Sequence, residues 1–184
     1  MINDIFKDMK DRMDKAINHY KTELSTIRTG RANPSVLDSV KVDYYGVMSA
    51  LNTLAHISVP EAQLILVQPF DPSTLESIER AIVASELGLN PNNDGNVIRL
   101  SVPSLTEERR LDLVKSVQKI IEDGRVAIRN IRRDINNMLK ELEKTNDLSE
   151  DNLKRALDNV QDSTDQSIKE LNKIQEKKEK EILD

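Results

Sequence analysis

Residues 106–144 carry an apolar side chain at nearly every third or fourth position, and no proline interrupts them. This spacing is typical of a long amphipathic helix whose apolar stripe forms a coiled-coil-like seam. At ~1.5 Å per residue the helix would extend nearly ~60 Å. Ser104 and Glu107 are expected to form a capping box at its start, and Thr145–Asp147 to end it. The expected seam consists of Val114, Val117, Ile121, Ile128, Ile131, Ile135, Met138 and Leu142.

Two further stretches have the same period. Residues 2–28 repeat apolar side chains without an intervening glycine or proline, until Thr29-Gly30 breaks the pattern. A third helix is predicted to start after Ser149, because a hydroxyl side chain followed by acidic residues favours a helix amino end. A helix with one apolar stripe is not stable alone in water, whereas three packed together bury all their stripes. The sequence therefore predicts a three-helix bundle.

Between the first two helices the apolar period changes from three or four to two. Strands are predicted over residues 40–44, 55–59, 64–70 and 98–102. Ser73 and Glu76 are a candidate capping box for a helix that continues through Leu87 and is closed by Gly88. The segment NPNNDG, Asn90–Gly95, is predicted to be a turn. These elements indicate a compact inserted α/β domain.

The predicted fold class is α+β, an elongated three-helix bundle with an inserted small α/β sandwich domain on a hinge. The bundle would comprise residues 1–29 and 106–184, and the inserted domain residues 31–104. Glycine, proline and polar residues at both chain crossings favour a hinge there. The expected hinge residues are Thr29, Gly30 and Arg31 at the first crossing, and Pro103, Ser104, Leu105 and Thr106 at the second.

Composition fits this architecture and excludes several classes of protein. Apolar residues make up 38% of the chain, aromatic residues 3% and charged residues 32%, a balance typical of narrow aliphatic seams with solvated charged faces. The absence of cysteine excludes disulfide frameworks, thiolate zinc sites and cysteine nucleophiles. No run reaches the ~20 apolar residues of a membrane span, and the amino end lacks a signal-peptide core. We therefore expect a soluble cytoplasmic protein with no membrane partner.

Enzyme chemistry has little support in the sequence. The two histidines, His19 and His56, lie in different predicted domains without ligand-like neighbours, so both are interpreted as surface or packing residues and no metal site is expected. No glycine-rich phosphate-binding motif is present. The NPNNDG segment lacks the acidic residues at the first and twelfth positions of a calcium loop. No catalytic residue and no cofactor are predicted.

A row of arginines on the long helix carries more functional signal. Arg125, Arg129 and Arg132 fall on one stripe about a quarter turn from the apolar seam, and Arg133 flanks it, so the arginines are expected to stay outside. Their planar guanidinium groups suit phosphate. The structural alternative is pairing with nearby acids, Glu122 or Asp134. Because the net charge is −5, any RNA contact would be a local stripe on an acidic protein. Further arginines lie at the crossings: Arg28, Arg31, Arg109 and Arg110.

Five segments resemble the ribosome recycling factor family, in order and over essentially the whole chain. They are KTELSTIRTGRANPS (Lys21–Ser35), VDYYG (Val42–Gly46), LGLNPNNDG (Leu87–Gly95), PSLTEERR (Pro103–Arg110) and RVAIRNIRRD (Arg125–Asp134). The resemblance implies a three-helix bundle and an α/β domain joined by a flexible elbow. It also implies a non-enzymatic factor that binds the post-termination ribosome and, with elongation factor G and GTP hydrolysis by that partner, splits it into subunits.

The resemblance also implies roles for single residues. The bundle would lie on large-subunit rRNA of a 70S-type ribosome, with Arg132 as the critical arginine and Arg129 and Arg28 as further basic positions. Arg109 and Arg110 stand in the matching TEERR segment. The smaller domain and the elbow would face elongation factor G, and the protein is expected to act as a monomer. The expected rRNA-binding residues are Arg132, Arg129, Arg133, Arg125, Arg28, Arg110 and Arg109.

Composition and periodicity alone leave two other classes open. One is a coiled-coil adaptor or holdase that binds proteins through exposed apolar grooves and never contacts RNA. The other is an enzyme that uses the α/β insert, which the missing catalytic constellations disfavour. The family resemblance favours the recycling factor over both.

Overall fold

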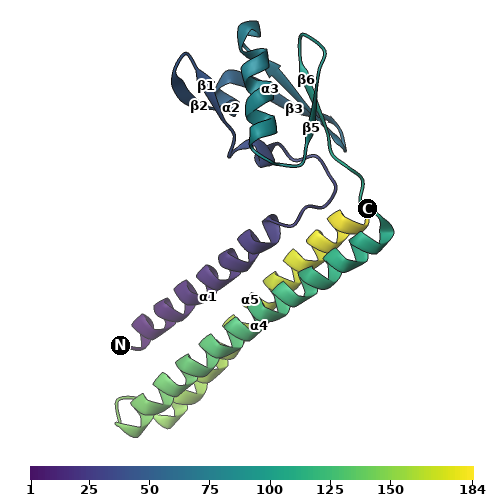
Figure 1. Ribbon diagram of the computed structural model, residues 1–184. Coiled ribbons are helices and arrows are strands. Elements are labelled where there is room, and N and C mark those ends of the chain that lie inside the picture. The colour runs from purple at the N-terminus through teal and green to yellow at the C-terminus, as the bar shows by residue number, and fades with distance from the viewer. The chain divides into compact units, whose positions relative to one another are not determined.

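The computed structural model describes residues 1–184 and divides into two compact units (Figure 1). Unit 1 is discontinuous in sequence and comprises Met1–Thr29 and Glu107–Asp184. Unit 2 comprises Gly30–Thr106. The first is a helical bundle and the second a small α/β domain, so the predicted fold class is confirmed. None of the helices combines the length and the apolar character that a membrane span requires.

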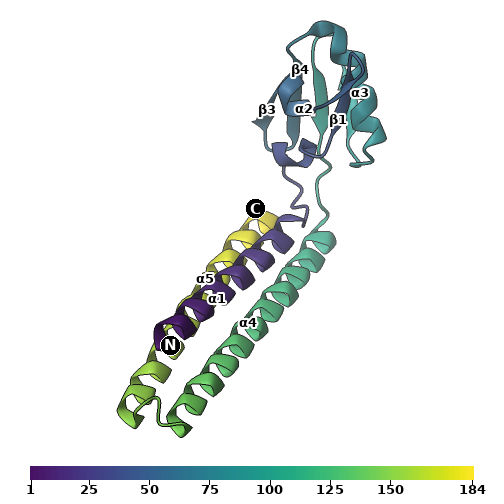
Figure 2. The same cartoon turned by 90° about the vertical axis from the view of Figure 1, so that its left-hand side faces the viewer.

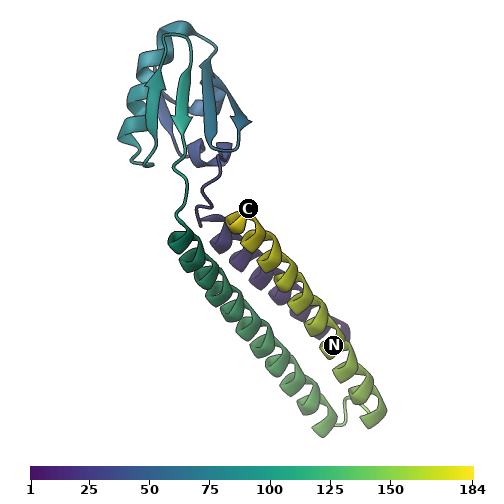
Figure 3. The ribbon, with the colours of Figure 1, turned by 90° about the vertical axis from the view of Figure 1, so that its right-hand side faces the viewer.

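Unit 1 consists of three helices that run side by side (Figures 2 and 3). They are α1 (Ile2–Ser25), α4 (Glu107–Lys144) and α5 (Glu150–Leu183). Each helix buries one apolar stripe against the other two, as its sequence period requires. The end of α4 at Lys144 and the start of α5 were both predicted, and the Ser149 side chain accepts a hydrogen bond from the Asn152 backbone N–H at 3.3 Å.

The seam of α4 differs in part from the prediction. Val114 and Leu142 are only half-buried and Met138 is exposed, whereas Leu113 and Leu139 are buried in their place. The predicted ladder followed the 3.5-residue period of a supercoil, but a straighter helix turns every ~3.6 residues, so the inward positions move along the sequence. The buried positions of α4 are Leu113, Val117, Ile121, Gly124, Ile128, Ile131, Ile135 and Leu139.

Gly124 shows how closely the three helices approach one another. A glycine inside a long helix is unfavourable by ~1 kcal/mol relative to alanine, so its position needs a packing reason. A Cβ atom at this site would lie 3.2 Å from the Tyr20 ring of α1 and 3.3 Å from Leu171 of α5. The missing side chain therefore allows α1 and α5 to pack against the same point of α4.

Two helix boundaries of unit 1 differ from the prediction. Helix α1 ends at Ser25 rather than at residue 28, and the Thr26 hydroxyl donates a hydrogen bond to the Glu23 carbonyl at 2.7 Å. The predicted capping box of Ser104 and Glu107 is wrong, because Glu107 is itself the first residue of α4 and Ser104 lies well before it.

Unit 2 is built on a four-stranded antiparallel sheet with strand order β3-β4-β6-β5. These strands are β3 (Ala55–Glu61), β4 (Leu64–Pro69), β5 (Asn90–Asn93) and β6 (Ile98–Ser101). A separate hairpin, β1 (Lys41–Tyr44) with β2 (Val47–Ala50), and helix α3 (Leu75–Ala84) complete the layers. Short helices η1 (Pro34–Leu37), α2 (Leu51–Leu54) and η2 (Pro72–Thr74) connect them. The core contains Leu37, Val42, Leu51, Ile65, Val67, Ile78, Ile82, Ile98 and Leu100.

Several predictions for unit 2 were wrong. Asn90–Asn93 is not a turn but an edge strand, and the actual turn lies at Asp94–Gly95. Ser73 and Glu76 do not form a capping box, because Asp71 accepts the Ser73 backbone N–H at 3.0 Å and a 3₁₀ turn precedes α3. Helix α3 ends at Ala84. Strand β2 and helix α2 were not predicted.

The two ends of unit 2 meet. The α-carbon of Gly30 packs against Leu105, since a Cβ atom there would lie 2.9 Å from the Leu105 side chain, and Gly30 has φ = 75°. The Ser104 hydroxyl accepts a hydrogen bond from the Gln63 amide at 2.8 Å. Nearby, the Ala32 N–H donates to the Ala62 carbonyl at 2.7 Å. The chain therefore enters and leaves unit 2 at adjacent points.

Candidate nucleic-acid interface

The four arginines of Arg125–Arg133 lie on α4 in the bundle, but they have different surroundings. Arg125 is only 22% exposed and is held by α5. Its Nε and Nη2 atoms donate to Oδ1 of Asn172 at 3.1 and 2.6 Å, and Nη2 also donates to Oε1 of Gln175 at 2.7 Å. The prediction that all these arginines stay outside the helix interface is therefore wrong for Arg125, which joins α4 to α5.

Glu122 bridges Arg125 and Arg129. Its two carboxylate oxygens lie 3.1 Å from Nη1 of Arg125 and 3.2 Å from Nη1 of Arg129. The hydrogen bond from Arg125, reinforced by that from Arg129, holds the pKa of the Glu122 carboxyl below its ordinary value. The structural alternative considered from the sequence, pairing with a nearby acid, thus holds for these two arginines.

Arg132 and Arg133 form no ion pair. Nη1 of Arg132 donates a hydrogen bond to Oε1 of Gln161 on α5 at 3.1 Å. Nη2 of Arg133 donates one to Oδ1 of Asn130, on α4 itself, at 3.4 Å. Asp134, the nearest acid in sequence, is instead bound by Arg12 of α1 at 2.7 Å. Neutral amides orient guanidinium groups without cancelling their charge, so these two adjacent arginines keep a full positive charge on the bundle surface.

The arginines at the ends of the bundle have other settings. Arg28 is exposed just beyond the end of α1. Arg110 is half-buried, and its Nη1 atom lies 3.5 Å from the carbonyl oxygen of Leu183 at the end of α5. A cation beside the last carbonyls of a helix is stabilising, so Arg110 also has a structural task in unit 1. Arg109 is exposed on α4, and Arg31 belongs to unit 2. A role of these residues in RNA binding stays a prediction.

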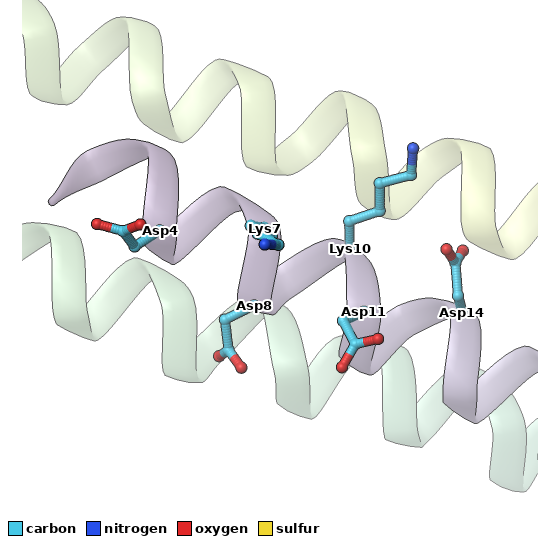
Figure 4. A pocket seen from close by; sticks show the side chains of 6 residues that line it. All are labelled: Asp4, Lys7, Asp8, Lys10, Asp11 and Asp14. Atoms are coloured by element: carbon cyan, nitrogen blue, oxygen red, sulfur yellow. The ribbon is translucent and has the colours of Figure 1, made fainter.

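The outer face of α1 carries acidic and basic side chains in alternation. Asp4, Asp8, Asp11 and Asp14 line a shallow surface depression together with Lys7 and Lys10 (Figure 4). Asp11 is paired with Lys15 at 2.7 Å, a contact that raises the pKa of the lysine through a hydrogen bond. Arg12 likewise lies 3.8 Å from Asp8, so the four carboxylates have four cations around them and this face offers phosphate no excess of positive charge. The face of α4 around Arg132, where two guanidinium groups have no carboxylate partner, is the better candidate for nucleic acid.

The two histidines agree with the sequence interpretation. His19 is exposed, lies 3.7 Å from Glu23 and makes an edge contact with Tyr20. His56 is exposed on β3. No group of three or more histidine, cysteine or acidic residues is arranged to hold a metal ion.

Sequence reasoning missed the amides that position the arginines. Gln161, Asn172 and Gln175 come from α5 and contact Arg132 or Arg125 across the helix interface. Their spacing of eleven and three residues puts them on one helical face, beside the apolar seam of the third helix. A search for a polar stripe that flanks this seam would have found them.

Comparison with known proteins identifies the family. A family model described as "Ribosome recycling factor" matches residues 20–183. The ribosome-recycling factor of Clostridium acetobutylicum is 51% identical over 183 residues, which cover 100% of this chain and 99% of that protein. That of Syntrophomonas wolfei is 52% identical over 184 residues and covers 100% of both chains. The chain therefore belongs to the ribosome recycling factor family.

Two solved structures agree with this assignment. A ribosome recycling factor determined in solution has a TM-score of 0.79 and 46% identity, with coverage of 99% of this chain and 97% of that chain. A second structure has a TM-score of 0.66 and 43% identity over 100% of both chains. It is described as models for the T. thermophilus ribosome recycling factor and the E. coli elongation factor G bound to the E. coli post-termination complex.

Proposed function

We propose that this protein binds the post-termination ribosome and, with elongation factor G and GTP, splits it into subunits, so that mRNA and tRNA are released for a new round of translation. Family membership over the whole chain supports this function. On this proposal the protein is a cytoplasmic monomer and not an enzyme, because its partner hydrolyses the GTP. It needs no metal and no cofactor of its own.

The observation that carries an RNA-binding role is the pair Arg132 and Arg133, which face neutral amides rather than carboxylates. The planar guanidinium group of arginine matches the geometry of phosphate. Because neither arginine has an ion pair, no ion pair must break before a phosphate binds. Arg132 is the central contact on large-subunit rRNA, and Arg129 joins it by exchanging Glu122 for a phosphate. Arg125 stays tied to α5 and keeps the row in place.

The bundle and the inserted domain have separate tasks in this mechanism. The continuous apolar core of α4 stiffens the bundle, so a displacement applied at one end reaches the rRNA as strain. Hinge movement at residues 29–31 and 103–106 lets elongation factor G push the inserted domain. Glycine at position 30 supports a hinge at the first crossing, because a residue without a Cβ atom has a wide range of accessible backbone angles.

The test is sedimentation of the protein with vacant ribosomes across a salt series. Wild type is compared with Arg132→Ala and with Arg155→Ala, a control that removes the same charge from an exposed position of α5. We expect a steep loss of affinity with salt for wild type and a slope lower by about one for Arg132→Ala. The control variant should behave like wild type.

Other results would contradict the proposal in different ways. Equal affinity and equal slope for Arg132→Ala and wild type would exclude Arg132 as the central RNA contact. Binding that ignores both salt and mutation would support the coiled-coil adaptor instead. No binding to ribosomes at all would contradict the proposed function itself.

A further inference from the structure

Arg125 and Arg132 use different edges of their guanidinium groups within the protein. Arg125 donates from Nε and Nη2 to the single Oδ1 atom of Asn172, and from Nη1 to Glu122. Arg132 donates through Nη1 alone, to Oε1 of Gln161. The Nε–H and Nη2–H groups leave a guanidinium group in parallel from one edge, and this edge matches two oxygens of a phosphate. That edge is occupied in Arg125 and free in Arg132.

Gln161 presents its carbonyl oxygen to Arg132 because its amide nitrogen is already engaged. Nε2 of Gln161 donates to Oδ1 of Asp165, one turn further along α5, at 2.8 Å. The reverse orientation would set an N–H group against a guanidinium group and a carbonyl oxygen against a carboxylate, and both contacts are repulsive. Asp165 therefore fixes the orientation of the amide that holds Arg132.

The same amide keeps Arg132 and Asp165 apart. The guanidinium group and the carboxylate each bind one end of Gln161, and no ion pair joins them. A direct ion pair would offset the positive charge of Arg132 and occupy N–H groups that a phosphate could use. A neutral amide between them transmits the orientation through two hydrogen bonds and leaves that charge available to a ligand.

This arrangement occurs a second time between α4 and α5. Gln175 accepts a hydrogen bond from Arg125 at 2.7 Å and donates one to Oε1 of Glu179 at 2.8 Å. In both cases the carboxylate follows the glutamine by four residues on α5. The second case is closed to ligands, because every nitrogen of the Arg125 guanidinium group already donates within the protein. The arrangement at Arg132 is the open one.

The two hydrogen bonds of Gln161 contribute little to stability. Gln161 and Asp165 are both exposed, and substitutions at such surface positions usually change the free energy of unfolding only slightly. Their effect on binding is larger. A mobile arginine side chain loses rotamer freedom when it binds a phosphate, whereas a side chain that is already held loses less. The contacts of Gln161 therefore suit a binding task better than a structural one.

We propose that Gln161 is a positioning residue for RNA binding: its carbonyl oxygen holds Nη1 of Arg132, so that the Nε and Nη2 edge is ordered and open before a phosphate group arrives. This inference rests on the proposed function, in which Arg132 contacts rRNA. It assigns a task in that site to α5, which supplies no cation to the contact but sets the geometry of one on α4.

Gln161→Met and Gln161→Glu test this role, because both keep the length of the side chain and favour a helix. Methionine lacks the acceptor, but its bulk still separates Arg132 from Asp165. Glutamate keeps an acceptor and adds a charge that offsets that of Arg132. Gln166→Met is the matched control, at an exposed position of the same helix. Two quantities are measured: ribosome affinity by sedimentation across a salt series, and the mobility of the Arg132 Nε–H bond in the free protein by NMR relaxation.

We expect Gln161→Met to melt at the wild-type temperature and to keep the wild-type salt slope. It should weaken ribosome binding by about three- to tenfold, because the arginine side chain must then be ordered during binding. The Nε–H bond of Arg132 should become more mobile in the same variant. Gln161→Glu should lower the salt slope by about one, as Arg132→Ala does. Gln166→Met should match wild type in every measurement.

In an Arg132→Ala background, Gln161→Met should have no further effect, because both residues act through one contact. An equal loss of affinity in both backgrounds would overturn the inference, since Gln161 would then contact RNA itself. Wild-type affinity of Gln161→Met, or an Arg132 side chain as rigid as in wild type, would overturn it as well. Failure of the proposed function is recognised separately: wild type itself would then not bind ribosomes, and the inference would fall with it.

Discussion

The structure predicts opposite consequences for two arginines that are seven residues apart on the same helix. Arg125→Ala should destabilise the bundle, whereas Arg132→Ala should leave it as stable as wild type and weaken ribosome binding. Arg125 bonds to Asn172, Gln175 and Glu122, and its side chain is mostly buried. Arg132 has one amide partner on the surface.

The expected loss of stability depends on which polar groups each substitution leaves without a hydrogen-bond partner. Hydrogen bonds to a charged group are worth ~1.5–3 kcal/mol when buried, and Arg125→Ala also leaves the amide oxygens of Asn172 and Gln175 without their donor. Because the site is partly open to solvent, we expect a loss of about 2–3 kcal/mol. For a domain of this size that corresponds to a melting temperature lower by roughly 8–15 °C. Arg132→Ala should cost less than ~0.5 kcal/mol.

The assay is thermal and urea unfolding followed by far-UV circular dichroism, together with the ribosome sedimentation described above. Arg125→Lys is an informative intermediate, because lysine keeps the charge but cannot bind both amides with a planar fork. Equal stability of Arg125→Ala and wild type would refute the inference that the α5 amides clamp this residue. A large loss of stability in Arg132→Ala would refute the division of tasks between the two arginines.

Three further predictions concern single positions. Gly124→Val should lower the free energy of unfolding by ~1–3 kcal/mol in urea titrations, because its side chain would press on Tyr20; wild-type stability would exclude the close packing. Glu122→Gln should tighten ribosome binding by about two- to fivefold at low salt, because Arg129 loses its carboxylate partner, and this gain should vanish in an Arg129→Ala background. Backbone N–H groups of the turn, then Arg99, lower the pKa of Asp94 to about 2. The resulting stabilisation is complete above the ordinary carboxyl pKa and disappears as the pH falls from ~4 to ~2, so an NMR titration of this carboxyl with a midpoint near 4 would contradict it.

The bundle was predictable because its chemistry is local. A three-to-four-residue apolar period defines α1, α4 and α5, and the hydroxyl of Ser149 starts α5 by a cap that sequence rules describe. The exact buried positions were less predictable, because a small error in the assumed helical period adds up to one residue over a long helix. Leu139 is buried and Met138 is exposed, the reverse of what the period predicted for Met138. Which of the two is buried depends on how the helices cross.

The inserted domain was less predictable because pairing between distant segments decides it. Strand β5 has the composition of a turn, yet its backbone completes the sheet edge beside β6. Pro91 is tolerated there because an edge strand does not need every N–H for pairing. Such a strand has no alternation of apolar and polar residues from which it could be predicted. It is recognised as a strand only by its pairing with β6.

The candidate site divides in the same way. The arginine row follows from helical geometry, but the separation of Arg125 from Arg132 depends on amides contributed by α5. A sequence gives the positions of charges along one helix. It does not show which of them a second helix has already bound.

The meeting of Gly30 with Leu105 has a consequence for how the chain folds. Residues 1–29 must find residues 107–184 across the whole of unit 2, and closing a flexible loop of that length costs roughly 4 kcal/mol of chain entropy. Unit 2 is continuous in sequence and complete before the last helix is synthesised, so it can fold first. Its folding brings Gly30 beside Leu105, and the distant pairing of α1 with α4 becomes a local one. Folding of the inserted domain thus lowers the entropy cost of assembling the bundle, whose two sequence segments lie on either side of it.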